Sequence, residues 1–229
     1  MVELLPEDAR GKMRFNDGAV DCRGRFWAGE MDQEACNDHL RLRPPKGRLW
    51  RFDPDGTATK ILDGIYCSNG IGWSPDNKWM YYNDSHGLLT RRFDFDAETG
   101  AISNSTDFAD FRNPEDSKIP RTAPKLPEDL LGGKPDGLVM DTEGDIWIAV
   151  WERGCVLCFK PTGELIREVR SNDAKYTTCP AWGGENLDIL FCTSANRFGE
   201  GGSNGGKLWR FDAGKHWGVR GQAKYKFSG

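Results

Sequence analysis

The chain has 229 residues, a formal net charge of -4 at pH 7 and no long apolar run. A membrane span is therefore not expected, and the weakly acidic balance, without a stripe of Lys or Arg, argues against nucleic acid as a partner. Seven cysteines, an odd number, and an N-terminus without signal-peptide features together predict a cytoplasmic protein with free thiols.

The first 13 residues are polar and carry no periodic pattern, so we predict an N-terminal tail over 1–13. From residue 14 to 229 we expect one domain built from a repeated unit. Each unit starts with an inner strand in which a polar residue precedes glycine, as in Asp17-Gly18, Asn69-Gly70 and Asp136-Gly137. In the fourth unit, Cys179 takes the place of the polar residue. These four residues are thus predicted to occupy one register of the repeat.

A turn and a second strand follow each inner strand, and a third strand then ends near an aromatic residue. These aromatics, Phe52, Phe93, Phe159 and Phe211, recur at intervals of 41, 66 and 52 residues. Such spacings are close to the roughly 40 to 50 residues of a four-stranded propeller blade. The long interval contains the proline-rich residues 112–134, which we predict to form a loop. The sequence therefore predicts an all-β fold, a β-propeller of about four to five blades.

Cys155 and Cys158 look like a metal-binding or redox pair, but they fall within a predicted third strand. Residues three apart in a strand point to opposite faces of the sheet. We therefore expect two packed thiols rather than a shared ligand or a disulfide.

Three motifs together, Arg14-Phe15-Asn16-Asp17-Gly18, Ser68-Asn69-Gly70 and Pro135-Asp136-Gly137, resemble the regucalcin (SMP-30)/gluconolactonase family. The resemblance extends from residue 14 to the end of the chain. It implies a six-bladed propeller that hydrolyses sugar lactones, a small-molecule substrate. It also implies one divalent metal ion, Ca²⁺, Zn²⁺, Mg²⁺ or Mn²⁺, at the mouth of the central channel.

Carried over position by position, the resemblance implies that Asn69 and Asp136 are metal ligands and that Arg14, Asn16 and Glu34 contact the substrate. Asp136 is also the expected catalytic residue, because a carboxylate beside a metal-bound water can act as general base. The family's third ligand, a Glu near the N-terminus, has no matching motif here. We therefore expect a chain truncated at its N-terminus.

Asn69 and Asp136 also have a structural interpretation, because Asn-Gly and Asp-Gly pairs commonly form turns. Arg14 could be a solvated surface charge, and Glu34 could equally have no role in the site. Repetition in one register favours function for Asn69 and Asp136. Asp17 could equally orient a ligand or form a turn, and Asp84, at the end of a predicted strand, could equally face the channel or form a turn. No Ser-His-Asp arrangement supports a serine hydrolase. The alternatives to a lactone hydrolase are a non-catalytic calcium- or ligand-binding propeller and an inactive truncated fragment.

Overall fold

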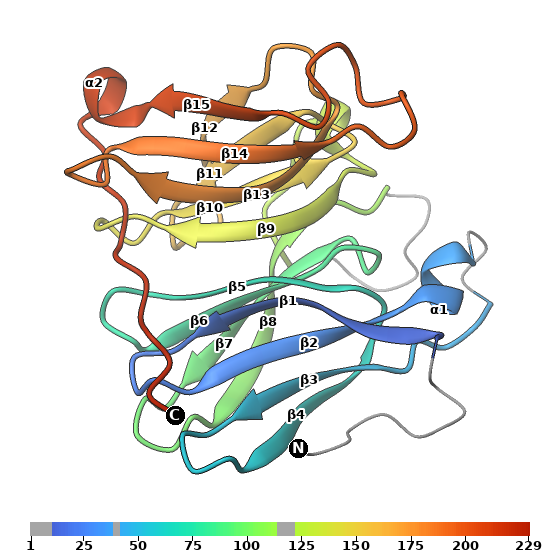
Figure 1. The fold of residues 1–229 in the computed structure, drawn as a ribbon, viewed down its shortest axis with the longest axis vertical. Helices are drawn as coiled ribbons and strands as arrows, with labels where there is room; N and C mark the ends of the chain where they lie inside the picture. Colours follow the sequence, from blue (N-terminus) through green and yellow to red (C-terminus); the bar gives the residue numbers. More distant parts are fainter. Residues whose placement is uncertain (1–10, 39–41, 114–121) are drawn as a thin grey trace.

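A computed structural model describes residues 11–38, 42–113 and 122–229. Its strands form consecutive antiparallel blades in which neighbours in the chain are neighbours in the sheet (Figure 1). The first blade contains β1 (Met13–Val20), β2 (Phe26–Asp32), β3 (Gly47–Phe52) and β4 (Ala58–Ile65). The second contains β5 (Ser68–Trp73), β6 (Trp79–Asp84), β7 (Leu89–Phe95) and β8 (Ile102–Asp110).

The remaining strands form two further blades, joined into one sheet by a single bridge between Trp151 and Tyr176. The third blade contains β9 (Lys134–Met140), β10 (Ile146–Trp151), β11 (Cys155–Phe159) and β12 (Leu165–Arg170). The last contains β13 (Tyr176–Gly183), β14 (Ile189–Ala195) and β15 (Leu208–Asp212). The helical elements are short, namely α1 (Gln33–Asn37), η3 (Glu128–Leu130) and α2 (Ala213–Trp217).

The inner strands β1, β5, β9 and β13 lie side by side in chain order. The predicted all-β propeller is therefore confirmed, and the aromatics expected in the third strands lie at or near the ends of β3, β7, β11 and β15. Within the described part of the chain, no helix is long and apolar enough to cross a membrane. Of the predicted tail over 1–13, residues 1–10 lie outside the described residues.

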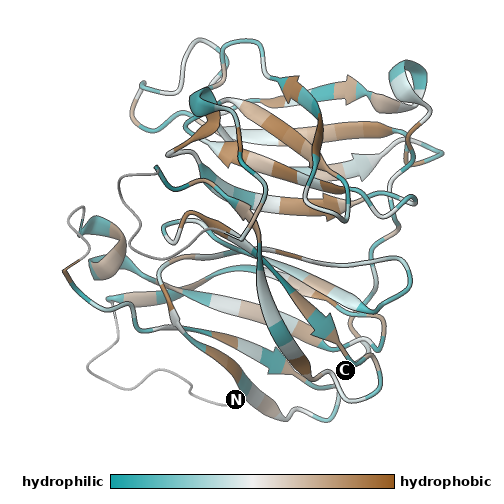
Figure 2. Cartoon of the chain, turned by 180° about the vertical axis from the view of Figure 1, so that it is seen from behind, coloured by the Kyte–Doolittle hydropathy of each residue, from teal (hydrophilic) through white to brown (hydrophobic). Residues whose placement is uncertain are grey.

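Large aromatic side chains fill the spaces between neighbouring blades. Between the first two blades, the Trp27 ring lies 5.8 Å from Trp73 and 6.2 Å from Phe95. The indole N–H of Trp27 donates to Asp21 at 2.9 Å, and Trp147 donates to Asp141 at the same distance in the third blade. Figure 2 shows the hydrophobic residues concentrated along the strands and the hydrophilic ones in many connecting loops. Buried rings thus pack neighbouring blades together, and the indole N–H groups of Trp27 and Trp147 have acceptors within their own blades.

Two expectations about particular segments can now be compared with the structure. Cys155 packs in the core between the second and third blades and Cys158 in the core between the third and fourth, which confirms that they face opposite sides. The described part of the loop predicted over 112–134 contains no strand before Lys134, where β9 begins, and it is only partly a surface feature. Its residues Leu126 and Leu130 are buried in the same core as Phe111.

The C-terminal segment crosses from the last blade to the first (Figure 1). Three of its backbone N–H groups donate to carbonyl oxygens of other segments. Gly221 donates to Leu187, Gln222 to Met140 and Ser228 to Gly24. This segment therefore spans the ends of the inner strands on the side of their first turns.

Candidate metal centre and substrate site

In each blade, the hydrogen-bonded pairing between the inner strand and the second strand is interrupted by a β-bulge at the same place. The register shifts occur between Phe15 and Gly18 in β1, Ser68 and Ile71 in β5, Ile148 and Val150 opposite β9, and Thr177 and Pro180 in β13. A bulge bends the strand and re-aims the side chains at the irregular positions. The four residues predicted to share one register, Asp17, Asn69, Asp136 and Cys179, all lie at these bulges.

Glycine allows the bulges of adjacent strands to approach each other closely. A Cβ atom on Gly70 would lie 2.4 Å from the backbone nitrogen of Leu138 and 2.8 Å from the carbonyl oxygen of Asp136. A Cβ atom on Gly137 would lie 3.0 Å from the Cα atom of Cys179. Only glycine fits such contacts with backbone. The polar-residue-then-glycine motif therefore has a physical reason, because it brings the inner strands together at the site.

Residues of β6 and the turn after it hold Asn69 and Asp136 in place. The buried Asn69 amide donates to the Ser85 hydroxyl group at 2.9 Å, and this hydroxyl group donates to the Pro135 carbonyl oxygen at 2.6 Å. The Asn83 amide donates to the backbone carbonyl oxygen of Asp136, also at 2.6 Å. The strands that carry the two predicted ligands are therefore cross-linked by side chains from the second blade.

Burial and, to a smaller extent, the negative charge of Asp17 together raise the pKa of Asp136 to about 7. Hydrogen bonds from the Asn69 side chain and the Gly137 N–H oppose this shift. The pKa of Asp17 is also raised by burial, while the Gly18 N–H and the Lys224 ammonium group lower it. Asp17, Asn69 and Asp136 thus form one electrostatic unit, which we call the acidic centre.

The predicted substrate contacts divide into a connected pair and a separate residue. The Arg14 guanidinium group donates to the Asn16 side-chain oxygen at 3.0 Å, and the Asn16 amide donates to the Ser68 carbonyl oxygen at 2.9 Å. Both residues are exposed beside Asn69. Glu34 lies on α1, where its half-exposed carboxylate pairs with Arg43 at 3.0 Å. Glu34 lines neither the cavity beside Asp17 nor the one beside Lys134 and Trp151.

A mostly apolar cavity of about 260 Å³ lies along the inner strands next to the acidic centre. Its wall includes Asp17, Leu138, Cys179 and, from the C-terminal segment, Lys224. We call it the channel cavity. Its apolar wall restricts water around the carboxylates, which accounts for their raised pKa values.

A family model described as the SMP-30/gluconolactonase/LRE-like region matches residues 2–196. The chain belongs to this family. Relatives in the family include human regucalcin, 34% identical over 222 residues that cover 94% of this chain and 67% of the relative. Pentonolactonase XacC of Haloferax volcanii is 32% identical over 87% of this chain and 62% of its own length.

Solved structures of the family agree with the described fold. The luciferin-regenerating enzyme superposes with a TM-score of 0.76 at 31% identity, over 96% of this chain and 67% of that one. A calcium-binding regucalcin from Agrobacterium tumefaciens superposes with a TM-score of 0.75 at 26% identity, over 97% of this chain and 67% of that one. The chain spans 65% of an uncharacterized relative from Sulfolobus acidocaldarius and 54% of Danio rerio regucalcin.

Sequence reasoning missed the positioning residues of the site. Asn83 and Ser85 flank Asp84 at the end of a predicted strand, and nothing in the composition of this stretch indicates that their side chains reach across to β9. Asp84, for which a channel-facing role and a turn role were both open, accepts from the backbone N–H groups of Tyr66, Cys67 and Gly87. Asp84 is therefore a turn residue in this family member.

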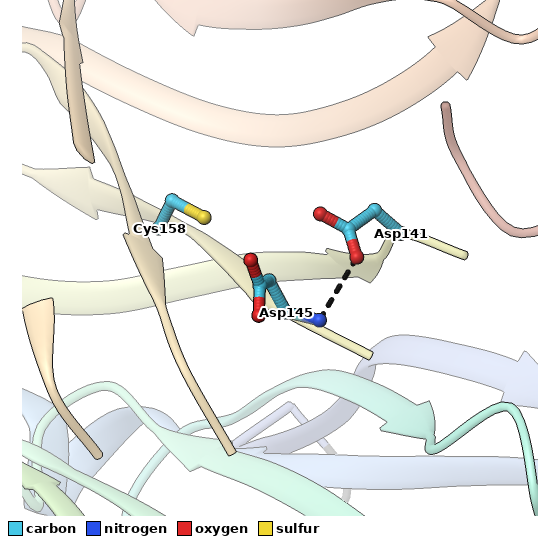
Figure 3. Close-up of side chains that lie close together, drawn as sticks. All are labelled: Asp141, Asp145 and Cys158. Carbon is cyan, nitrogen blue, oxygen red and sulfur yellow. Dashed lines mark hydrogen bonds between the residues drawn. The ribbon is translucent and has the colours of Figure 1, made fainter. Parts of the chain in front are cut away.

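A second group of potential ligands, Asp141, Asp145 and Cys158, lies in the third blade (Figure 3). The Asp141 carboxylate accepts from the Trp147 indole and from two backbone N–H groups, one of them that of Asp145. Asp145 forms ion pairs with Lys160 at 3.0 Å and Arg167 at 3.5 Å. Because Asp145 is paired with two cations and Asp141 accepts three hydrogen bonds, this group stabilises the turn and carries no metal assignment.

Proposed function

We propose that the chain is a metal-dependent hydrolase of sugar lactones. The observation that carries the proposal is the placement of Asp136, a half-buried carboxyl group with a pKa raised to about 7, beside the Asn69 amide. A general base is most effective when its pKa lies near the working pH. The name of the pentonolactonase relative supports the same activity.

The acidic centre suits a divalent metal ion. Asn69 and Asp136 supply amide and carboxylate oxygens, which are hard donors preferred by Ca²⁺, Mg²⁺, Mn²⁺ and, in part, Zn²⁺. The charge of Asp17 raises the pKa of Asp136, so a bound cation would offset an existing repulsion. When bound, such an ion polarises an ester carbonyl group and lowers the pKa of a coordinated water.

The chain's own residues provide the remaining steps of hydrolysis. The Asp136 carboxylate takes a proton from the attacking water, whose oxygen forms a bond to the lactone carbonyl carbon. The ring C–O bond then breaks, and the leaving alcohol oxygen receives the proton. The Arg14 guanidinium group and the Asn16 amide orient the sugar hydroxyl groups. The Glu34 carboxylate also accepts from a sugar hydroxyl group, once it has released its ion pair with Arg43.

Acid release from a panel of aldonolactones, with each of the four metal ions and with EDTA, tests the proposal. Asp136→Asn should abolish turnover, while Asp55→Asn, in an exposed turn, should leave it unchanged. If Asp136→Asn retains more than about a tenth of kcat/KM, a loss below about 1.4 kcal/mol, the role of Asp136 is wrong. Metal binding without turnover of any lactone would instead favour the non-catalytic calcium- or ligand-binding alternative.

A further inference from the structure

A polar cavity of about 390 Å³ opens between the first two blades and the last two. Ligand sites in proteins typically occupy roughly 300–1,000 Å³ and combine aromatic rings with a few polar groups. The wall of this cavity has that composition, with Tyr66, His86, Lys134, Trp151, Glu152 and Arg197. None of these residues belongs to the predicted metal and substrate set.

The polar cavity is lined by residues that adjoin the acidic centre in the chain. Lys134 is two residues before Asp136 on β9, and His86 directly follows Ser85. The Ser85 hydroxyl group links the segment that carries His86 to the strand that carries Lys134, because it donates to the carbonyl oxygen of Pro135 at 2.6 Å. A molecule bound in the cavity would therefore lie next to a lactone ring held at Asn69 and Asp136.

The polar groups of the cavity are held in fixed positions but remain accessible. The Glu152 carboxylate lies 2.7 Å from the Lys134 ammonium group and 3.6 Å from the Arg197 guanidinium group. The Lys134 and Glu152 side chains are 22% and 24% exposed. Trp151 is fixed by its contact with the Tyr176 ring, whose centre is 4.6 Å away. The cavity therefore presents prearranged donors, acceptors and an aromatic ring.

The balance of charge decides the class of ligand. The wall contains two cations, Lys134 and Arg197, and two carboxylates, Glu152 and Asp38. A free anion would gain no net attraction from a wall of balanced charge. A neutral polyol, in contrast, can donate to the carboxylates, accept from the cations and pack its C–H groups on Trp151 or Tyr66.

We propose that the polar cavity is a second sugar subsite, which binds the glycosyl unit of a disaccharide lactone whose lactone ring occupies the acidic centre. The assignment rests on the proposed lactonase function and names its substrate class, the aldobionolactones. The subsite binds the sugar whether or not the acidic centre is catalytically competent, so binding and turnover can be tested separately.

The turnover test compares cellobiono-1,5-lactone with glucono-1,5-lactone. The unaltered chain should show a KM about 10-fold lower for the disaccharide lactone, a difference of about 1.4 kcal/mol. Glu152→Gln and Arg197→Met, which alter the wall of the cavity and not the acidic centre, should remove this advantage and leave gluconolactone kinetics unchanged. Asp63→Asn provides a matched control, because Asp63 pairs with Lys60 at 2.7 Å on the surface of β4.

The binding test titrates cellobiose, glucose and inorganic phosphate into the same proteins by calorimetry. Binding of cellobiose that is lost in Glu152→Gln and kept in Asp63→Asn supports the subsite, even if no lactone is hydrolysed; in that case only the proposed function fails. Equal KM values for the two lactones, together with no cellobiose binding, overturn the subsite while the lactonase stands. Phosphate binding in place of cellobiose binding also overturns it and indicates an anion site.

Discussion

Ser85 fixes the orientation of Asn69 and at the same time ties it to the strand of Asp136. Its hydroxyl group accepts from the Asn69 amide at 2.9 Å and donates to the Pro135 carbonyl oxygen at 2.6 Å. The Asn69 nitrogen is thereby occupied, which leaves its side-chain oxygen as the ligand atom. The metal centre that we propose thus depends on a residue that is not itself a ligand.

Ser85→Ala should weaken metal binding by about 10- to 100-fold, the range found when a residue that orients a ligand is removed. Calorimetric titration of the metal-free protein with Ca²⁺ and Zn²⁺ measures the effect. Ser74→Ala is the matched control, since Ser74 is a buried serine in the same blade whose hydroxyl group binds Asp76. Equal affinities for the unaltered chain and Ser85→Ala would show that Asn69 needs no such support.

Asp136→Asn should make the metal-free protein more stable near neutral pH. The pKa of Asp136 is raised from 3.8 to about 7, so between these values the folded chain keeps a proton that the unfolded chain has released. Stability therefore falls as the pH rises through this window, and the asparagine variant escapes the loss. The gain at about pH 8 should reach as much as about 4 kcal/mol, and it should vanish near pH 3.

Urea unfolding in EDTA at both pH values measures the difference, with Asp55→Asn as the control for loss of a charge. A variant that is no more stable than the unaltered chain at the higher pH would mean that Asp136 is ionised at no cost in the folded protein. The result would then count against its role as a base of raised pKa.

The repeat could be predicted from the sequence because each of its parts is a local feature. The polar-residue-then-glycine pairs, the aromatics of the third strands and the alternation at Cys155 and Cys158 each depend on short-range geometry. All three appear in the structure as predicted. The register of Asp17, Asn69 and Asp136 followed from the same repetition.

What could not be predicted depends on contacts between distant segments. Nothing local to Ser85 shows that it reaches Pro135, fifty residues later. Likewise, residues 112–134 have no periodic pattern, and only the neighbouring blades show that Leu126 and Leu130 have a core to enter. Glu34 was assigned through resemblance alone, and its ion pair with Arg43 arises from the chain that follows α1.

Gly70→Ala should destabilise the fold and separate the strands of the two proposed ligands. The new Cβ atom would lie 2.4 Å from a backbone nitrogen of β9, which cannot move without shifting Asp136. Overpacking of this kind costs about 1–3 kcal/mol. Gly64→Ala provides the comparison, because Gly64 has a φ of +73° and open space around it, so its cost is backbone strain alone. Metal affinity should fall in the Gly70 variant only.

Leu130→Ala should cost about 2–5 kcal/mol, as expected for a leucine that is almost fully buried. Leu130 lies in the segment expected to be a loop and packs in the core with Phe111 and Val150. Leu42→Ala, at a leucine that is 78% exposed, is the control. A loss below about 1 kcal/mol for Leu130→Ala would mean that the segment contributes little to the core.

Arg14→Ala and Asn16→Ala should impair hydrolysis of sugar lactones more than that of a plain aliphatic lactone. Both side chains are exposed beside Asn69 and linked at 3.0 Å, so we expect them to bind hydroxyl groups rather than the ester. Each should raise KM for gluconolactone about 10-fold, equivalent to one lost hydrogen bond of about 1.4 kcal/mol. Glu34→Gln should raise it less, because Glu34 must first give up its bond to Arg43 at 3.0 Å. Equal losses on both substrates would indicate instead that the metal centre has been disturbed.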